Sequence, residues 1–191
     1  TYGAHHLMGN ITGNQDRPRF TSLAEGAVAM DEDAKFAGWT RNIQHQGEDG
    51  HAKMQLLMSY LFSIPGVPCI YYGDEFADVG GNDPDNRKMM RFTGLSEKER
   101  ETRSQVADWA RLRTSRMSMM YGSTDYEEVA PGCLQITRRY LGEETRILIN
   151  KTPNDLPLPH GPDWSEWELL FGANSLDNRS IPARSAVALG L

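Results

Sequence analysis

The sequence has few cysteines, and no group of residues has the spacing of a metal site. Cys69 and Cys133 are the two cysteines among 191 residues, and neither has a potential ligand at a short, regular distance along the chain. We expect two free, buried thiols, which leaves the redox compartment open. His5 and His6 are adjacent and would point to opposite faces of a strand. The sequence therefore indicates neither a metal site nor a cofactor.

Long apolar runs and clusters of basic residues are also missing. No run approaches the length of a membrane-spanning helix, and no basic segment followed by an apolar one resembles a signal peptide. The net charge is −6, and no Lys/Arg cluster is present that would follow phosphates, so nucleic acid is not expected as a partner. Thr1 does not look like a natural start, which leaves the localisation unknown.

The stretch from Ser63 to Phe92 is the most informative part of the chain. After the turn Ile64-Pro65-Gly66, the run Val67–Tyr72 has the length and the β-branched and aromatic content of a strand buried on both faces. Polar and glycine residues follow directly. A buried strand followed by such a loop is how an α/β protein presents ligand-binding groups at the carboxyl end of a parallel sheet.

A second polar segment follows a second predicted strand earlier in the chain. Residues 5–12 read as a short strand, and Asn14, Gln15 and Asp16 come directly after it. A helix is predicted to begin within 17–23, with Pro18 in its first turn. Residues 24–49 show little periodicity, and they either fold over the site or form a solvated loop.

Two helices are predicted more firmly. Residues 51–64 are apolar nearly all round, which is typical of a helix packed on a sheet, with its methionines in the core. Residues 96–116 begin with Ser96-Glu97-Lys98-Glu99, the pattern of a capping box. A break near Thr102 is one alternative for this helix.

The pattern changes from Tyr121 onward. Short apolar or alternating runs are separated by Pro, Gly and Asn, as in an antiparallel sandwich. The runs lie at Cys133–Thr137, Arg146–Asn150, Trp167–Phe171 and Ser185–Leu189.

Three of these segments resemble the α-amylase family of glycoside hydrolases (family 13). IPGVPCIYYGDE followed by GGNDPDNRKMMRF resembles the eighth strand of the family's barrel and the loop after it. Asn14-Gln15-Asp16, followed by Arg19-Phe20, resembles the motif after the seventh strand, although Gln15 stands where the family has histidine. IPARSAVALGL resembles the last strand of the family's β-domain.

The resemblance implies an α/β plus all-β chain. Residues 1–118 would be the C-terminal portion of a (β/α)8 TIM barrel, and residues 119–191 would be an antiparallel Greek-key β-sandwich domain. The longer protein would be a retaining α-glycosidase acting on α-glucans such as starch or maltooligosaccharides. A missing barrel half, or another copy of the chain, would cover the two exposed barrel strands.

The resemblance also implies roles for single residues. Asp16 matches the family's third catalytic acid, which stabilises the transition state by holding sugar hydroxyls. The nucleophile and the acid/base follow the fourth and fifth barrel strands of the family, so they would lie upstream of Thr1, and the isolated chain would be inactive. The residues implied to bind substrate are Asn14, Gln15, Asp83 and Arg87.

Other interpretations remain open at this point. Asn14-Gln15-Asp16 is also typical of an ordinary turn, in which Gln15 is a neutral turn residue. Asp83 and Arg87 also suit a structural ion pair that closes a glycine-rich loop. The alternative function for the isolated chain is a non-enzymatic carbohydrate-binding or structural module.

Overall fold

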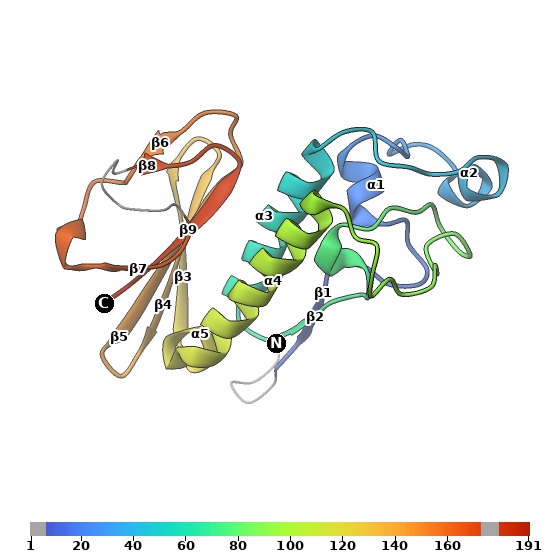
Figure 1. Ribbon diagram of the computed structural model, residues 1–191. Helices are drawn as coiled ribbons and strands as arrows, with labels where there is room; N and C mark the ends of the chain where they lie inside the picture. Colours follow the sequence, from blue (N-terminus) through green and yellow to red (C-terminus); the bar gives the residue numbers. More distant parts are fainter. Residues whose placement is uncertain (1–6, 173–179) are drawn as a thin grey trace. The chain divides into compact units, whose positions relative to one another are not determined.

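Figure 1 shows the computed structural model of the chain, which describes residues 7–172 and 180–191. The described residues form two compact units. The first, which we call the loop unit, contains residues 10–58 and 68–106. The second, the β unit, contains the described residues of 1–9, 59–67 and 107–191. His5 and His6, which the sequence analysis rejects as a metal pair, lie outside the described residues.

The two strands that carry the site segments are short. Strands β1 (Gly9–Ile11) and β2 (Val67–Cys69) form a two-stranded sheet, and Val67 N donates to Met8 O at 2.8 Å. The prediction of a strand over Val67–Tyr72 buried on both faces is wrong. Val67 is 49% exposed, because a strand is buried on both faces only between neighbouring strands and covering helices. Within the described residues, β1 is the strand paired with β2.

The two cysteines have different environments. Cys133 is buried, as predicted, and burial raises the pKa of its thiol. Cys69, which ends β2, is exposed, so the prediction of a second buried thiol is wrong. The cause is the same as for Val67, because Cys69 belongs to a strand whose faces the described residues cover only in part.

The segment between the two site motifs folds more than its sequence suggested. Helix α1 (Phe20–Ala24) begins later than predicted, so Pro18 precedes the helix instead of lying in its first turn. Residues 24–49 contain a further short helix, α2 (Ala34–Thr40), whose cap residue Asp33 accepts hydrogen bonds from two backbone amides. The alternative of a plain solvated loop is wrong, because the segment builds a small core. That core consists of Ala27, Val28, Ala37, Ile43 and Val79.

The two long helices agree with the sequence prediction. Helix α3 (Asp49–Ser63) buries Met54 and Met58 completely, which confirms that its methionines belong to the core. Helix α4 (Glu97–Ser115) runs through Thr102 without a break. Thr102 is itself buried, and its hydroxyl accepts a hydrogen bond from Gln55 of α3 at 3.1 Å. No helix in the described part of the chain is long and apolar enough to cross a membrane.

The start of α4 has the predicted capping box. Glu99 N donates to Ser96 Oγ at 3.3 Å, and Ser96 N donates to Glu99 Oε2 at 2.7 Å. These reciprocal bonds satisfy two backbone donors that the helix itself cannot pair. The helix therefore begins where its sequence places the cap.

The variant Ser96→Ala is expected to lower the free energy of unfolding by about 1 kcal/mol, because the first turn loses a hydroxyl acceptor. The measurement is urea denaturation followed by far-ultraviolet circular dichroism. The matched control is Ser104→Ala, an exposed serine in the middle of α4. Alanine favours a helix at such a position, so this control is expected to be neutral or slightly stabilising. An equal loss of unfolding free energy in both variants would show that the Ser96 cap contributes nothing to stability.

The β unit contains the antiparallel domain that the sequence predicted. A five-stranded sheet has the order β3-β4-β5-β9-β7, and every neighbouring pair is antiparallel. Strands β6 and β8 form a small second sheet. The strands are β3 (Ser123–Ala130), β4 (Cys133–Tyr140), β5 (Glu143–Asn150), β6 (Leu156–Pro157), β7 (Glu168–Phe171), β8 (Ser180–Ile181) and β9 (Ser185–Gly190).

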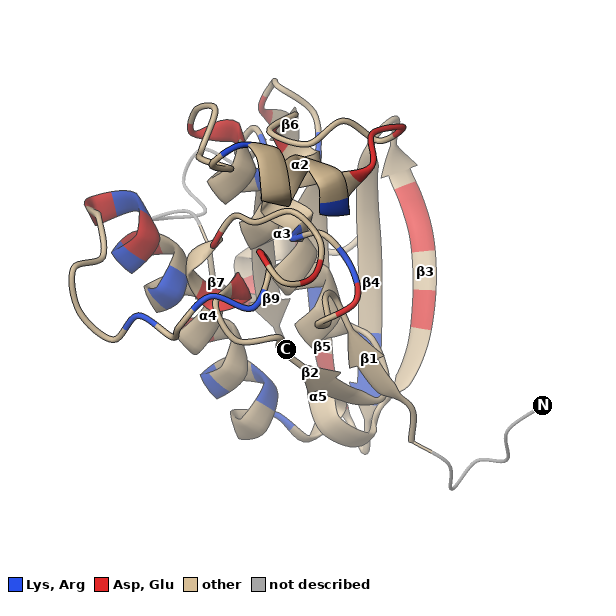
Figure 2. Ribbon diagram, turned by 90° about the vertical axis from the view of Figure 1, so that its right-hand side faces the viewer, with Lys and Arg blue, Asp and Glu red and all other residues tan. Residues whose placement is uncertain are grey.

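One core cluster joins the strands of this domain. Ile181 from the small sheet belongs to the same buried cluster as Leu148 and Val187 from the large one. Helix α5 (Met117–Tyr121) packs against β4 and β5, and the 3-10 turn η2 (Trp164–Glu166) precedes β7. Strand β3 was not predicted. It lies at the edge of the sheet and carries acidic residues, as Figure 2 shows, and charges on an edge strand discourage pairing with another chain.

Two buried arginines hold the end of α3 within the β unit. Arg113 donates to Phe62 O at 2.6 Å and to Ile64 O at 2.9 Å, and Arg138 donates to Ser63 O at 3.0 Å. Carbonyl groups at a helix C-terminus carry partial negative charge, so they suit a cationic partner. Burial lowers the pKa of Arg138 to about 10, and nearby Arg113 adds to this effect.

Candidate functional site

Asn86 joins the two polar segments that the sequence singled out. Its side chain is fully buried, and its Nδ2 donates to Arg17 O at 2.6 Å and to Asn14 O at 3.3 Å. Asn14 Oδ1 in turn accepts from Asp16 N at 2.8 Å, a local bond typical of a tight turn. The segment after β1 and the segment around Asp83 therefore share one scaffold, although they are about seventy residues apart in the chain.

Arg87 connects the charged groups of the two segments. Its guanidinium lies 3.5 Å from Asp16 Oδ1 and 3.0 Å from Asp83 Oδ1, and its Nε donates to Gln15 O at 3.4 Å. Gln15 Nε2 donates to Asp16 Oδ2 at 3.1 Å. The structure thus brings Asn14, Gln15, Asp16, Asp83 and Arg87 into one cluster, which we call the Asp16 cluster.

The Asp16 cluster is open to solvent. The Asp16 side chain is 70% exposed and that of Arg87 is 45% exposed. Ion pairs as exposed as these add little to the stability of a protein, typically about 0–1 kcal/mol. Their carboxylate and guanidinium groups can also exchange water for another polar ligand, since exposure leaves one side of each group uncovered.

Arg19 is a buried arginine that bonds to the segments on either side of the Asp83 loop, and the sequence analysis gave it no role. Its guanidinium donates to Tyr72 O at 2.6 Å, to Asp74 Oδ1 at 3.0 Å and to Asn86 O at 2.8 Å. It also lies over the ring of Tyr71, 4.2 Å from the centroid. The feature of the sequence that could have indicated a role for Arg19 was its position three residues after Asp16, in the Arg19-Phe20 pair. The spacing alone did not reveal which acid it would meet.

The partner of Arg19 has a strongly shifted pKa. Asp74 begins the 3-10 turn η1 (Asp74–Phe76), and its side chain is 1% exposed. Burial raises the pKa of Asp74 to about 6, while the charge and hydrogen bond of Arg19 and a hydrogen bond from Thr12 oppose the rise. The free energy that burial costs the charged carboxylate is larger than the free energy that its pairing with Arg19 returns. The pKa of Asp74 therefore lies well above the ordinary value for an aspartate.

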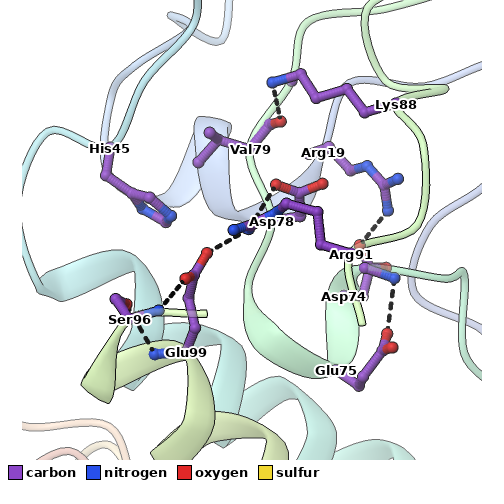
Figure 3. Close-up of polar contacts among 12 residues, drawn as sticks. Arg19, His45, Asp74, Glu75, Asp78, Val79, Lys88, Arg91, Ser96 and Glu99 are labelled. Carbon is purple, nitrogen blue, oxygen red and sulfur yellow. Dashed lines mark hydrogen bonds and ion pairs between the residues drawn. The ribbon is translucent and has the colours of Figure 1, made fainter. Parts of the chain in front are cut away.

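A second set of polar contacts, drawn in Figure 3, fixes the loop that runs from η1 to α4. Glu75 Oε2 accepts from Gly73 N at 2.7 Å, and Lys88 Nζ donates to Val79 O at 2.7 Å. Arg91 pairs with Asp78 at 3.4 Å and also with Glu99, the capping residue of α4. Lys88 and Arg91 therefore bond back to the start of the loop that carries Asp83 and Arg87, and Arg91 also ties its end to α4.

The arrangement can bind a neutral, hydroxyl-rich ligand. Carboxylates accept short hydrogen bonds from hydroxyl groups, and a guanidinium donates in a planar fork. Among residues 7–172 and 180–191, no group of three or more His, Cys, Asp or Glu side chains is arranged to hold a metal ion.

Comparison with known proteins gives the class of the chain. No family model matches the sequence. A cyclomaltodextrinase from Thermoanaerobacter pseudethanolicus is 27% identical over 151 residues, which are 78% of this chain and 22% of that protein. A maltogenic α-amylase from Bacillus acidopullulyticus is 33% identical over 131 residues, 66% of this chain and 22% of that protein. The crystal structure of an Anoxybacillus α-amylase matches with a TM-score of 0.72 and 26% identity over 96% of this chain and 38% of that one.

These relatives are glycoside hydrolases that act on α-glucans. The chain itself belongs to the α-amylase family, glycoside hydrolase family 13, as the three sequence motifs implied. It spans 22% of the length of each of the two curated relatives.

Proposed function

We propose that the chain is the C-terminal portion of a retaining α-glycosidase acting on α-glucans, and that the Asp16 cluster holds the sugar at the point of cleavage. The single observation that carries the proposal is the position of Arg87. It lies 3.5 Å from Asp16 and 3.0 Å from Asp83, so residues of two separate family motifs meet in one solvent-exposed cluster.

Each residue of the cluster has a role in this proposal. Asp16 accepts hydrogen bonds from the hydroxyls of the reacting sugar. Such bonds strengthen as the ring flattens toward an oxocarbenium ion, which is worth several kcal/mol to the transition state. Gln15 donates an amide hydrogen bond, but it cannot become cationic as a histidine would. Asn14, Asp83 and Arg87 bind neighbouring hydroxyls.

The two reacting carboxyl groups come from outside this chain in the proposal. A retaining glycosidase needs a nucleophile and an acid/base about 5–5.5 Å apart, and the family motifs that carry them have no match here. We therefore assign residues 1–118 to part of a barrel and residues 119–191 to a β-sandwich domain. Either the rest of the barrel or a second copy of the chain covers β1, where Ile11 is 59% exposed.

The proposal predicts that the isolated 191-residue chain does not hydrolyse starch, cyclodextrins or a chromogenic maltoside, whereas the full-length protein does. The measurement is the release of reducing sugar and chromophore at matched concentrations of the two proteins. Turnover by the isolated chain that disappears in Asp16→Ala would overturn the assignment, because the chain would then hold a complete site. A full-length protein that binds maltooligosaccharides without cleaving them would favour the carbohydrate-binding module instead.

A further inference from the structure

Helix α2 is fixed to the loop that carries Asp83. Asn82 N donates to Ala34 O at 3.0 Å, and Lys35 Nζ lies 3.5 Å from Asp83 Oδ2. Two glycines allow this close approach. A Cβ atom at Gly81 would lie 2.5 Å from Ala34 O, and one at Gly38 would lie 2.7 Å from the Cβ of Asp85. The helix therefore cannot move away from the Asp16 cluster without breaking these contacts.

The contacts of α2 define which of its faces borders the site. Lys35 and Gly38 face the loop with Asp83, and Ala37 is buried in the small core of the loop unit. Residues four apart in a helix lie on the same face, so Trp39 stands one turn beyond Lys35 on the side of Asp83.

Trp39 exposes a large apolar surface at this border. It is 68% exposed, although tryptophan is usually highly buried. A series of charged groups leads from the Asp16 turn to α2. Arg87 lies 3.5 Å from Asp16 and 3.0 Å from Asp83, and Asp83 lies 3.5 Å from Lys35. A row of hydrogen-bonding groups that ends at an aromatic side chain matches an oligosaccharide, because each sugar ring has hydroxyls at its edge and C–H groups on its faces.

We propose that Trp39 is a stacking platform for a glucose unit of a long α-glucan, next to the units held by the Asp16 cluster, and that it sets the preference for chain length. This inference rests on the proposed function, since it names the ligand of the same site. The proposed ligand of Trp39 is a glucan chain. The alternative that the test must separate is that another part of the protein covers Trp39.

The test compares three variants of the full-length protein on a short chromogenic maltoside and on maltoheptaose. Trp39→Ala is expected to raise KM for maltoheptaose roughly three- to tenfold, as expected for the loss of one aromatic stacking contact. Its kcat and its KM for the short substrate are expected to stay unchanged. Trp39→Phe keeps a ring and is expected to restore most of the affinity. Tyr121→Ala, a comparably exposed aromatic in helix α5 of the β unit, is the control and is expected to have no effect on either substrate.

Two results would overturn the inference. One is an unchanged KM of Trp39→Ala for maltoheptaose. The other is an equal loss on both substrates together with a lower melting temperature, which would show that protein covers Trp39. The proposed function fails separately, when Asp16→Asn leaves kcat unchanged, so the two failures are distinguishable.

Discussion

Replacing Asp16 by Asn in the full-length protein is expected to lower kcat by two or more orders of magnitude, with a much smaller change in KM. A hundredfold loss corresponds to about 2.7 kcal/mol of transition-state stabilisation. The variant keeps the shape and one acceptor oxygen but removes the charge, so it weakens those bonds that become strongest when the sugar ring carries positive charge. An interaction made mainly in the transition state appears in kcat. Steady-state kinetics on a short and a long maltooligosaccharide measure both constants.

Two further variants separate this effect from a general loss of charge. Asp31→Asn removes the same charge from another exposed position of the loop unit, and it is expected to leave both constants unchanged. Arg87→Ala is expected to raise KM for long substrates with kcat largely kept, because it binds ground state and transition state alike. If Asp16→Asn retains near-normal kcat, Asn14-Gln15-Asp16 is an ordinary turn and Asp16 is no catalytic acid.

Removal of the buried guanidinium of Arg19 is expected to have the largest effect on stability. Arg19→Met leaves the Asp74 carboxylate buried without its cation, and breaking a buried pair in this way costs about 3–5 kcal/mol. It also removes the donors to Tyr72 O and Asn86 O that join the two site segments. We therefore expect a lower urea midpoint and the loss of the Asp16 cluster together.

The loss in Arg19→Met is expected to depend on pH. Arg19 opposes the rise in the pKa of Asp74 to about 6, so without it this pKa goes higher. At about pH 5, Asp74 is protonated in both folded proteins, and the variant loses only hydrogen bonds. At about pH 8, the folded variant binds more protons at Asp74 than its unfolded chain does, so its free energy of unfolding falls as the pH rises.

Urea denaturation at both pH values measures this difference. The control Arg17→Met removes an exposed arginine two residues earlier and is expected to change stability by less than about 0.5 kcal/mol. The double variant Arg19→Met/Asp74→Asn is expected to lose the additional pH dependence. If the loss of unfolding free energy in Arg19→Met is the same at both pH values, the buried Asp74 carboxylate is not what destabilises the variant.

Local signals in the sequence predicted the parts of the fold that depend on near neighbours. The capping box at Ser96 needs only residues within one turn, and α4 begins there. The resemblance to the segments after the seventh and eighth barrel strands implied that Asp16 lies near Asp83 and Arg87, and their side chains do lie together. The sequence therefore indicated both the start of α4 and the composition of the Asp16 cluster.

The missed features depend on contacts that no short pattern encodes. Arg19 pairs with Asp74, which is 55 residues away in the chain, and the sequence around neither residue indicates its partner. Helix α2 has seven residues with a glycine inside, and two glycine contacts with the Asp83 loop fix its position instead of an apolar stripe. The exposure of Cys69 was missed because burial of β2 depends on neighbouring strands, which the sequence of the strand does not report.

The most direct test of the account is a crystal structure of the full-length protein with a bound maltooligosaccharide or acarbose. We expect the Asp16 carboxylate to accept hydrogen bonds, about 2.5–3.0 Å long, from hydroxyls of the sugar ring at the cleavage point. We expect Asp83 and Arg87 to contact the hydroxyls of the next ring. A sugar bound elsewhere, with Asp16 exposed to water in the same turn as in the free chain, would contradict the assignment of this cluster as the substrate site.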